Sequence, residues 1–265
     1  MNFGESHVTT PVRDQRFSTT LAHGLELLGS FRAGEPMLSN RQFAERTGLS
    51  KATVSRLTYT LAEIGFLKYD LEQRKYRLGA AALSVSYPLL SSLRIRQIAR
   101  PIMRELANAA RGSVSLGMRD RTNMVYIETS RGHDAITFRP DIGASLPIVR
   151  SAMGRAWAAK MQAGELTALQ TQIHDSDPAT WGEFGARFAA SVKSFRRTGF
   201  CVSLGDWRGE IHAVAVPMRM PIDGETLVFN CGVPALHLRP GALEREIGPQ
   251  LKVLVRNVEQ AMGLE

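Results

Sequence analysis

The sequence predicts an α+β protein in two parts, a small helical N-terminal domain ending in a hairpin and a larger domain with an antiparallel sheet. Residues 39–61 contain two helix starts separated by a glycine. Two short runs with aromatic residues follow at 66–69 and 75–78. From residue 113 onward, short alternating strands are interspersed with helical segments. The 265 residues suffice for two modest domains.

Composition and charge narrow the class of protein. Hydrophobic residues make up 44% of the chain, which is enough for globular cores, and the formal net charge is +8. A basic chain favours a polyanionic partner, most often nucleic acid, although an ordinary basic enzyme is the alternative. The two cysteines form no Cys-x-x-Cys pair, and the start of the chain does not have the pattern of a signal peptide. We therefore expect a cytoplasmic protein with free thiols and, because no apolar run reaches about 18 residues, no membrane span.

The stretch at 39–61 predicts a short helix, a turn and a second helix. Ser39 followed by Gln42 is typical of a capping box. Gly48 supplies the turn, because glycine enters left-handed backbone conformations without steric cost. Ser50 can cap the second helix. Residues at three- and four-residue spacing predict its buried stripe: Val54, Leu57, Leu61 and Ile64.

The opposite face of the second helix is polar and basic, and this favours DNA binding. The second helix of a helix-turn-helix lies in the major groove, where Lys51 and Arg56 could donate to guanine or phosphate. An ordinary solvated helix face is the alternative, but the caps, turn glycine, apolar stripe and polar face all agree. The candidate DNA-contacting residues here are Ser39, Arg41, Ser50, Lys51, Thr53, Ser55, Arg56 and Tyr59.

A hairpin follows the second helix directly. Gly65 ends the helix, and the runs at 66–69 and 75–78 flank a polar turn. A hairpin in this position is a wing, and Arg74, Lys75 and Arg77 would face the phosphate backbone. Their contribution would depend on salt and not on sequence.

These motifs together resemble the IclR family of bacterial transcription regulators. The resemblance rests on Ser-Lys-Ala-Thr-Val-Ser-Arg-Leu at 50–57, Leu-Ala-Glu-Ile-Gly-Phe-Leu at 61–67 and Lys-Tyr-Arg-Leu-Gly at 75–79. The chain departs from the family pattern at Thr58, where leucine is usual, and at Tyr59. Further matches follow at 143–159 and in the strands after Gly199. The resemblance implies an N-terminal winged helix-turn-helix domain, a connecting helix and a C-terminal GAF-like α/β effector domain with an antiparallel sheet.

The chain is accordingly divided into four parts. Residues 1–16, which include Arg13 and Arg16, are polar without periodicity and are expected to form a flexible arm. The winged domain is expected at 17–79, a linker helix at 80–92 and the effector-binding and oligomerisation domain at 93–265. The first helix of the winged domain should pack through a stripe at helical spacing, Leu21, Leu25, Leu28 and Phe31 or Leu27.

The helical region at 80–111 contains two prolines, and the C-terminal part alternates strands and helices. At least one helix break or start is expected at Pro88 or Pro101. A hairpin is predicted at 113–129 and a further strand at 135–138, before a loop leads to a helix capped by Ser151. The later elements are expected as helices at 165–174 and 178–198, strands at 199–203, 211–218 and 226–232, and a final helix opening at Arg239-Pro240.

The family resemblance implies a small-molecule pocket beside the sheet. From the residues alone, a helix start at Ser151 could hold a carboxylate, or its small residues could serve a tight helix-to-sheet contact. The large apolar residues Phe138, Met153 and Phe229 suggest an aromatic or otherwise bulky carboxylate. The residues assigned by position are Ala135, Phe138, Leu146, Ser151, Ala152, Met153, Ser203, Asp206, Trp207, His212, Phe229 and Cys231.

No catalytic or metal-binding motif emerges. The six histidines show no metal-ligand spacing, and the chain contains no Gly-x-Ser-x-Gly elbow, phosphate-binding loop or dinucleotide fingerprint. We expect no enzyme activity, no cofactor and no metal. The alternatives are a metabolite-processing enzyme fused to a DNA-binding module and a basic protein that coats DNA without sequence preference.

The expected function is effector-controlled transcription regulation, as either repressor or activator. The expected partners are double-stranded DNA with a near-palindromic operator, a small-molecule effector and further copies of the chain, as a dimer or dimer of dimers.

Overall fold

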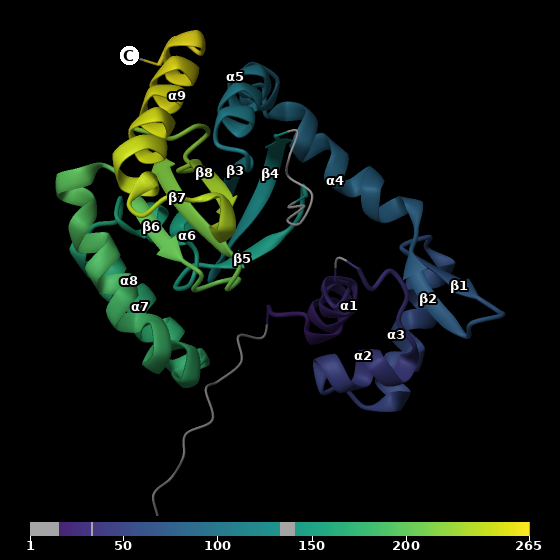
Figure 1. The fold of residues 1–265 in the computed structure, drawn as a ribbon. Helices are drawn as coiled ribbons and strands as arrows, with labels where there is room; N and C mark the ends of the chain where they lie inside the picture. Colours follow the sequence, from purple (N-terminus) through teal and green to yellow (C-terminus); the bar gives the residue numbers. More distant parts are fainter. Residues whose placement is uncertain (1–15, 33, 133–140, 265) are drawn as a thin grey trace, which may run out of the picture. The chain divides into compact units, whose positions relative to one another are not determined.

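The computed structural model describes residues 16–32, 34–132 and 141–264, and these fall into two compact units divided between Ser91 and Ser92 (Figure 1). The arm expected at 1–16, apart from Arg16, and the strand expected at 135–138 lie outside the described residues. Within the described ranges, no helix is long and apolar enough to cross a membrane.

The N-terminal unit is a three-helix module with a hairpin. It comprises α1 (Thr19–Gly29), α2 (Asn40–Thr47), α3 (Lys51–Glu63), β1 (Leu67–Asp70) and β2 (Lys75–Leu78). The two strands are antiparallel, and Leu38 adds a bridge to Tyr76. Each helix contributes an apolar side chain to one core, whose buried members are Leu27, Leu38, Phe43, Val54, Leu61 and Leu67.

The apolar stripes expected on the first and third helices are each partly wrong. Leu21 and Leu25 are 63% and 59% exposed, because α1 turns Leu27 toward the core instead. Ile64 is 57% exposed, because it is the C-cap of α3 and the helix has already ended there. Val54 and Leu61 are buried as expected.

Thr58, the departure from the family pattern, is a fully buried polar residue in α3. Its hydroxyl lies 2.9 Å from the carbonyl oxygen of Val54 and 3.2 Å from Oδ1 of Asn40 at the start of α2. A buried hydroxyl must be hydrogen-bonded to avoid a desolvation penalty. Through its contact with Asn40, the threonine therefore ties α3 to α2 by a polar contact where leucine would contribute only packing.

The helix break or start that was expected at Pro88 or Pro101 occurs at neither proline. Pro88 lies inside α4 (Ala80–Ser92) and Pro101 inside α5 (Ile95–Ala109), and the helices are separated at Leu93-Arg94. A proline leaves the carbonyl four residues earlier without its helical donor. Here those carbonyls belong to Ser84 and Gln97, which are exposed, so water can replace the missing donor.

The C-terminal unit is built on a six-stranded antiparallel sheet. The spatial order is β5-β4-β3-β8-β7-β6. The strands are β3 (Ser113–Asp120), β4 (Asn123–Arg131), β5 (Ser145–Pro147), β6 (Cys201–Leu204), β7 (Ile211–Pro217) and β8 (Val228–Pro234). The predicted strands at 113–129, 199–203, 211–218 and 226–232 are thus present, whereas β5 formed from a stretch that we expected to be a loop.

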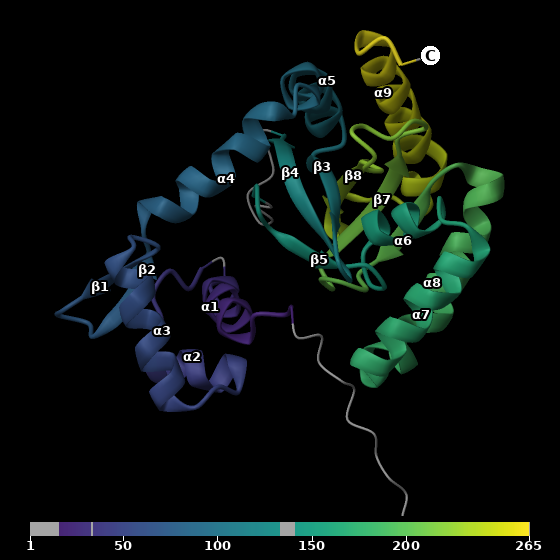
Figure 2. The same cartoon turned by 180° about the vertical axis from the view of Figure 1, so that it is seen from behind.

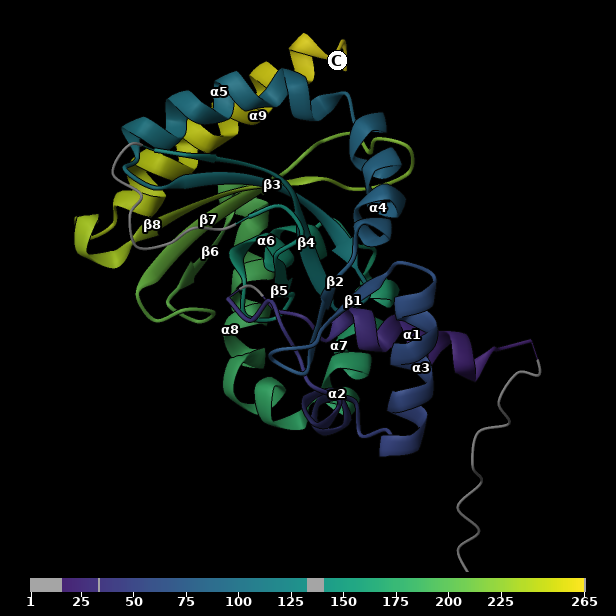
Figure 3. The same cartoon turned by 90° about the vertical axis from the view of Figure 1, so that its right-hand side faces the viewer.

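Helices cover both faces of this sheet. α5 and α9 (Gly248–Ala261) lie side by side over one face, while α6 (Ala152–Ala158) lies against the other (Figures 2 and 3). α7 (Ala163–Ser176) and α8 (Pro178–Thr198) form a helical hairpin on the α6 side. The final helix begins later than expected, because a π-helical turn at Leu243–Ile247 precedes α9.

Candidate DNA-binding surface and effector cavity

The turn before α3 has the predicted geometry. Ser39 and Gln42 form a reciprocal capping box at the start of α2, and Gly48 ends that helix with φ 71°. Ser50 Oγ accepts a hydrogen bond from the backbone N–H of Thr53 at 3.2 Å. Ser39, Ser50 and Thr53 therefore serve as caps or cap partners, and α3 begins in a fixed direction.

The outward face of α3 is polar, basic and exposed. Lys51, Ser55, Arg56 and Tyr59 are all exposed, with Tyr59 66% exposed. Among the described residues, no hydrogen bond or ion pair engages the Lys51 or Arg56 side chain. Two exposed cations on the second helix of a helix-turn-helix suit contact with an anionic groove.

The hairpin after α3 carries an aromatic pair near its turn and a basic residue in the turn itself. The Tyr69 and Tyr76 rings lie across the two strands with centroids 4.8 Å apart. Arg74 lies in the turn with φ 52° and is exposed, whereas Lys75 is half-buried and pairs in register with Asp70.

Arg41 on α2 already has a partner. Its Nε donates to Glu45 at 2.7 Å, and both side chains are largely exposed. An exposed pair of this kind contributes little to stability, so Arg41 can exchange Glu45 for a phosphate at small cost.

A small cavity lies between α6 and the sheet. Its volume is about 20 Å³. The structure brings together five residues that the sequence assigned to an effector pocket: Leu146, Ser151, Ala152, Ser203 and Trp207. It adds five that the sequence did not indicate, Tyr126, Ile211, Ala213, Asn230 and Gly232.

On β8 and β7 the residues that the sequence assigned to the pocket face away from this cavity. Asn230 and Gly232 line the cavity, so their neighbours Phe229 and Cys231 point to the opposite face of the sheet. The same alternation applies to β7. Ile211 and Ala213 line the cavity, so the side chain of His212 points to the opposite face of the sheet. Strand periodicity gives two faces but does not say which is covered by α6, so the sequence could not settle this choice.

Met153 and Asp206 also do not line the cavity. Met153 is fully buried against β3, where a Cβ added to Gly117 would come 2.5 Å from its sulfur. Asp206 is held by arginines, as described below. The expected residues Ala135 and Phe138 lie outside the described residues.

A buried ion pair fixes the loop that carries Trp207. Nη2 of Arg155 on α6 donates to Asp206 Oδ2 at 2.7 Å, and the exposed Arg187 on α8 donates to Oδ1 at 2.6 Å. Arg150 adds a bond to the Asp206 carbonyl at 2.7 Å. Burial lowers the pKa of the Arg155 guanidinium, and its bond with Asp206 opposes that shift. Asp206 is therefore a structural anchor beside the cavity.

The two thiols should be inert in the native protein. Cys201 and Cys231 are free and buried, and burial raises their pKa to about 11 and about 12. Below those values the thiol form prevails, and it is a poor nucleophile. A colorimetric disulfide reagent at pH 8 should titrate none of them in native protein and both after denaturation. Rapid reaction of one thiol in the native protein would contradict the buried placement.

Comparisons with known proteins bear on both units. Residues 20–71 match the IclR helix-turn-helix domain, and residues 87–231 match the bacterial transcriptional regulator IclR C-terminal domain. The chain is 32% identical to the HTH-type transcriptional regulator TsaQ1/TsaQ2 of Comamonas testosteroni, over 97% of this chain and 94% of that protein.

Solved structures give the same result for the fold. The crystal structure of an IclR family transcriptional regulator from Brucella abortus is 39% identical, with a TM-score of 0.81 and 94% of each chain covered. An IclR homolog from Microbacterium hydrocarbonoxydans, complexed with 4-hydroxybenzoate, shares the fold at 17% identity, with a TM-score of 0.69 over 93% of this chain and 100% of that chain. The helix-turn-helix with its wing, the six-stranded effector domain and these matches lead to one conclusion: the chain belongs to the IclR family of bacterial transcriptional regulators.

Proposed function

We propose that this regulator binds a near-palindromic operator in the cytoplasm as a dimer or a dimer of dimers. α3 enters the major groove, where Lys51, Ser55 and Arg56 contact base edges or phosphates, and the wing residues Arg74 and Lys75 contact the backbone. The observation that carries this proposal is the exposed face of α3, whose two cations have no partner among the described residues. Operator palindromy would mirror the twofold symmetry of the protein.

Exposed apolar side chains in the N-terminal unit support pairing of two chains. α4 has no buried residue, and Leu83, Val85 and Tyr87 are 68%, 67% and 63% exposed. Leu21 and Leu25 on α1 are equally exposed. Apolar surface of this extent is typical of an interface with a second chain.

If two chains pair through α4, charged side chains placed on that helix should disrupt the pairing. Leu83 and Tyr87 lie four residues apart on one face. Because charged groups at a pair interface lose their water, Leu83→Lys with Tyr87→Lys should convert the sedimenting species to monomer and weaken operator binding by about a hundredfold or more. Analytical ultracentrifugation and DNA titration measure both. The control, Ala186→Lys with Ala190→Lys, adds the same charge at exposed positions on α8, away from the proposed face. If the Leu83→Lys, Tyr87→Lys protein remained oligomeric, or if the control dissociated equally, the proposed face would be wrong.

The effector is proposed to be a small organic acid bound beside α6. Ser151, Ser203 and Asn230 supply polar groups there, and Tyr126 and Trp207 supply aromatic walls. A cavity of about 20 Å³ holds little more than a water molecule, so entry of an acid requires the Trp207 side chain to move. Because the loop backbone is anchored through Asp206, we place this movement in the indole side chain. The Microbacterium homolog makes 4-hydroxybenzoate a suitable first probe.

The test is fluorescence anisotropy with the intergenic DNA upstream of the protein's own gene and with a scrambled duplex, at physiological salt. The proposal predicts a preference of about a thousandfold for the upstream DNA, shifted by one member of a panel of small acids. Equal and steeply salt-dependent binding to both duplexes would instead support a non-specific DNA-coating protein. Turnover of a panel acid by the purified protein would favour the fused-enzyme alternative.

A further inference from the structure

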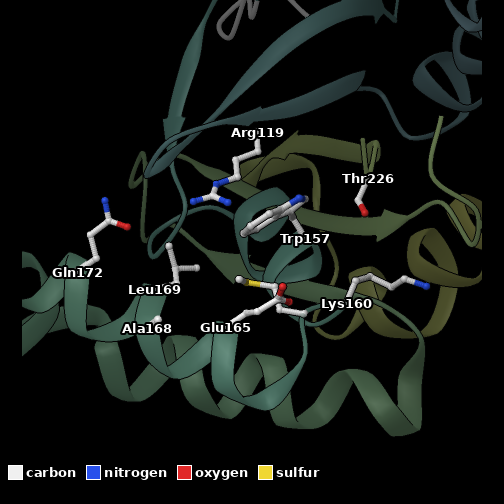
Figure 4. A pocket seen from close by; sticks show the side chains of 9 residues that line it. Arg119, Trp157, Lys160, Glu165, Ala168, Leu169, Gln172 and Thr226 are labelled. Atoms are coloured by element: carbon white, nitrogen blue, oxygen red, sulfur yellow. The ribbon is translucent and has the colours of Figure 1, made fainter. Parts of the chain in front are cut away.

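A second and larger cavity lies at the other end of α6. Its volume is about 420 Å³, within the range of small-molecule sites, and none of its lining residues is shared with the cavity described above. It is open to solvent and is bordered by the end of β3, the end of α6 and α7 (Figure 4). Its lining residues are Arg119, Trp157, Lys160, Met161, Glu165, Ala168, Leu169, Gln172 and Thr226.

Arg119 is held in a fixed orientation in this cavity. Its Nε donates to the carbonyl oxygen of Arg121 at 2.7 Å, and its Cζ lies 4.6 Å from the centre of the Trp157 ring. Its two terminal nitrogens have no hydrogen-bond partner among the described residues. In Figure 4 the guanidinium end points to the side where Leu169 and Gln172 project from α7. A fixed guanidinium with free terminal nitrogens is pre-organised to bind a carboxylate with two hydrogen bonds.

The other charges limit the ligand to a single negative charge. Lys160 points away from Arg119 and its Nζ donates to the carbonyl oxygen of Arg219 at 3.3 Å. Glu165 accepts from the backbone N–H of Gln162 at 3.2 Å and leaves a negative charge at the wall of the cavity. Two cations against one carboxylate favour a monoanion, whereas a dianion would meet repulsion from Glu165.

The remaining walls suit a flat apolar body. Trp157, Met161, Ala168 and Leu169 surround the space next to Arg119. Aromatic rings pack favourably against an indole and against aliphatic side chains. We propose that this cavity is a second ligand site, separate from the effector cavity, for a small aromatic monocarboxylate whose carboxylate binds Arg119.

The tryptophans allow the site to be observed directly. The chain has three, so Trp181→Phe with Trp207→Phe leaves Trp157 as the only indole. Titration of this protein with benzoate should change its emission in a saturable manner. Benzamide, which has the same ring without the charge, should bind about tenfold more weakly, as should inorganic phosphate, which has no ring.

Two substitutions then assign the site. Arg119→Gln should weaken benzoate binding about tenfold or more, because the charge-assisted hydrogen bonds are lost. Arg121→Gln is the matched control: its side chain is 86% exposed and its carbonyl remains to hold residue 119, so binding should be unchanged. Unchanged Trp157 emission at millimolar benzoate, or equal affinity of the Arg119→Gln protein, would overturn the proposal, as would equal binding of benzamide or phosphate.

A third variant keeps the test valid if the tryptophan replacements impair folding. Ala168 is exposed on α7, so Ala168→Phe in the wild-type background fills the cavity without disturbing a core. Calorimetry should then show loss of benzoate binding at one site. An unchanged benzoate isotherm in the Ala168→Phe protein would also overturn the proposal.

Discussion

Replacement of Lys51 and Arg56 by alanine should reduce operator affinity by about a hundredfold at constant salt, with no loss of stability. Each side chain is exposed and has no partner among the described residues, so its removal leaves no buried group unpaired. A good base contact contributes about 1–3 kcal/mol of discrimination, and each lost phosphate contact lowers the salt slope by about one. Anisotropy titrations at several salt concentrations would separate the two contributions.

The control for this prediction removes the same charge from the effector domain. Lys193 and Arg196 are exposed on α8, and Lys193→Ala with Arg196→Ala changes the net charge equally. That protein should bind the operator within a few-fold of wild type, because its charges lie outside the proposed interface. If the two double variants lost the same affinity, general charge and not α3 would explain the binding.

Loss of Arg155 should produce the largest effect on stability, about 3 kcal/mol. Arg155 is 2% exposed and donates to Val149, Val202 and Asp206. Arg155→Met keeps the volume but leaves a buried carboxylate without its buried partner, and such changes cost about 3–5 kcal/mol. Arg187 still pairs with Asp206, which places the expected loss at the lower end.

Denaturant unfolding followed by tryptophan fluorescence measures the free energy of unfolding of the C-terminal unit, because Trp157, Trp181 and Trp207 all lie there. The matched control is Arg187→Met. Its side chain is 61% exposed although it bonds the same aspartate, so the expected loss is below about 1 kcal/mol. Equal losses in the two variants would show that burial of the Arg155 pair is not what stabilises the loop.

Local chemistry made the N-terminal unit predictable from sequence. Caps at Ser39 and Ser50 and the left-handed Gly48 each follow from a side-chain or backbone property of one residue. The error at Leu21 and Leu25 has a different origin. Helical spacing identifies an apolar face but does not say whether the core of the same chain or a second chain covers it.

The effector domain shows where sequence reasoning ends. The strands were recognisable, yet the cavity depends on which face of β8 meets α6. The sequence favoured the larger residues Phe229 and Cys231, whereas the sheet register turns Asn230 and Gly232 toward α6. The cavity around Arg119 was equally invisible, because β3, α6 and α7 contribute its lining from distant parts of the chain.

The central claim, that an acid bound beside α6 controls operator binding, is tested most directly by measuring one coupling in two ways. Operator affinity is measured with and without the active acid, and acid affinity is measured with and without operator DNA. Thermodynamic linkage requires the same factor from both, and a coupling of about 5- to 150-fold is typical. The account predicts equal factors in this range. An acid that binds in the cavity lined by Ser151 and Trp207 and leaves operator affinity unchanged would contradict it.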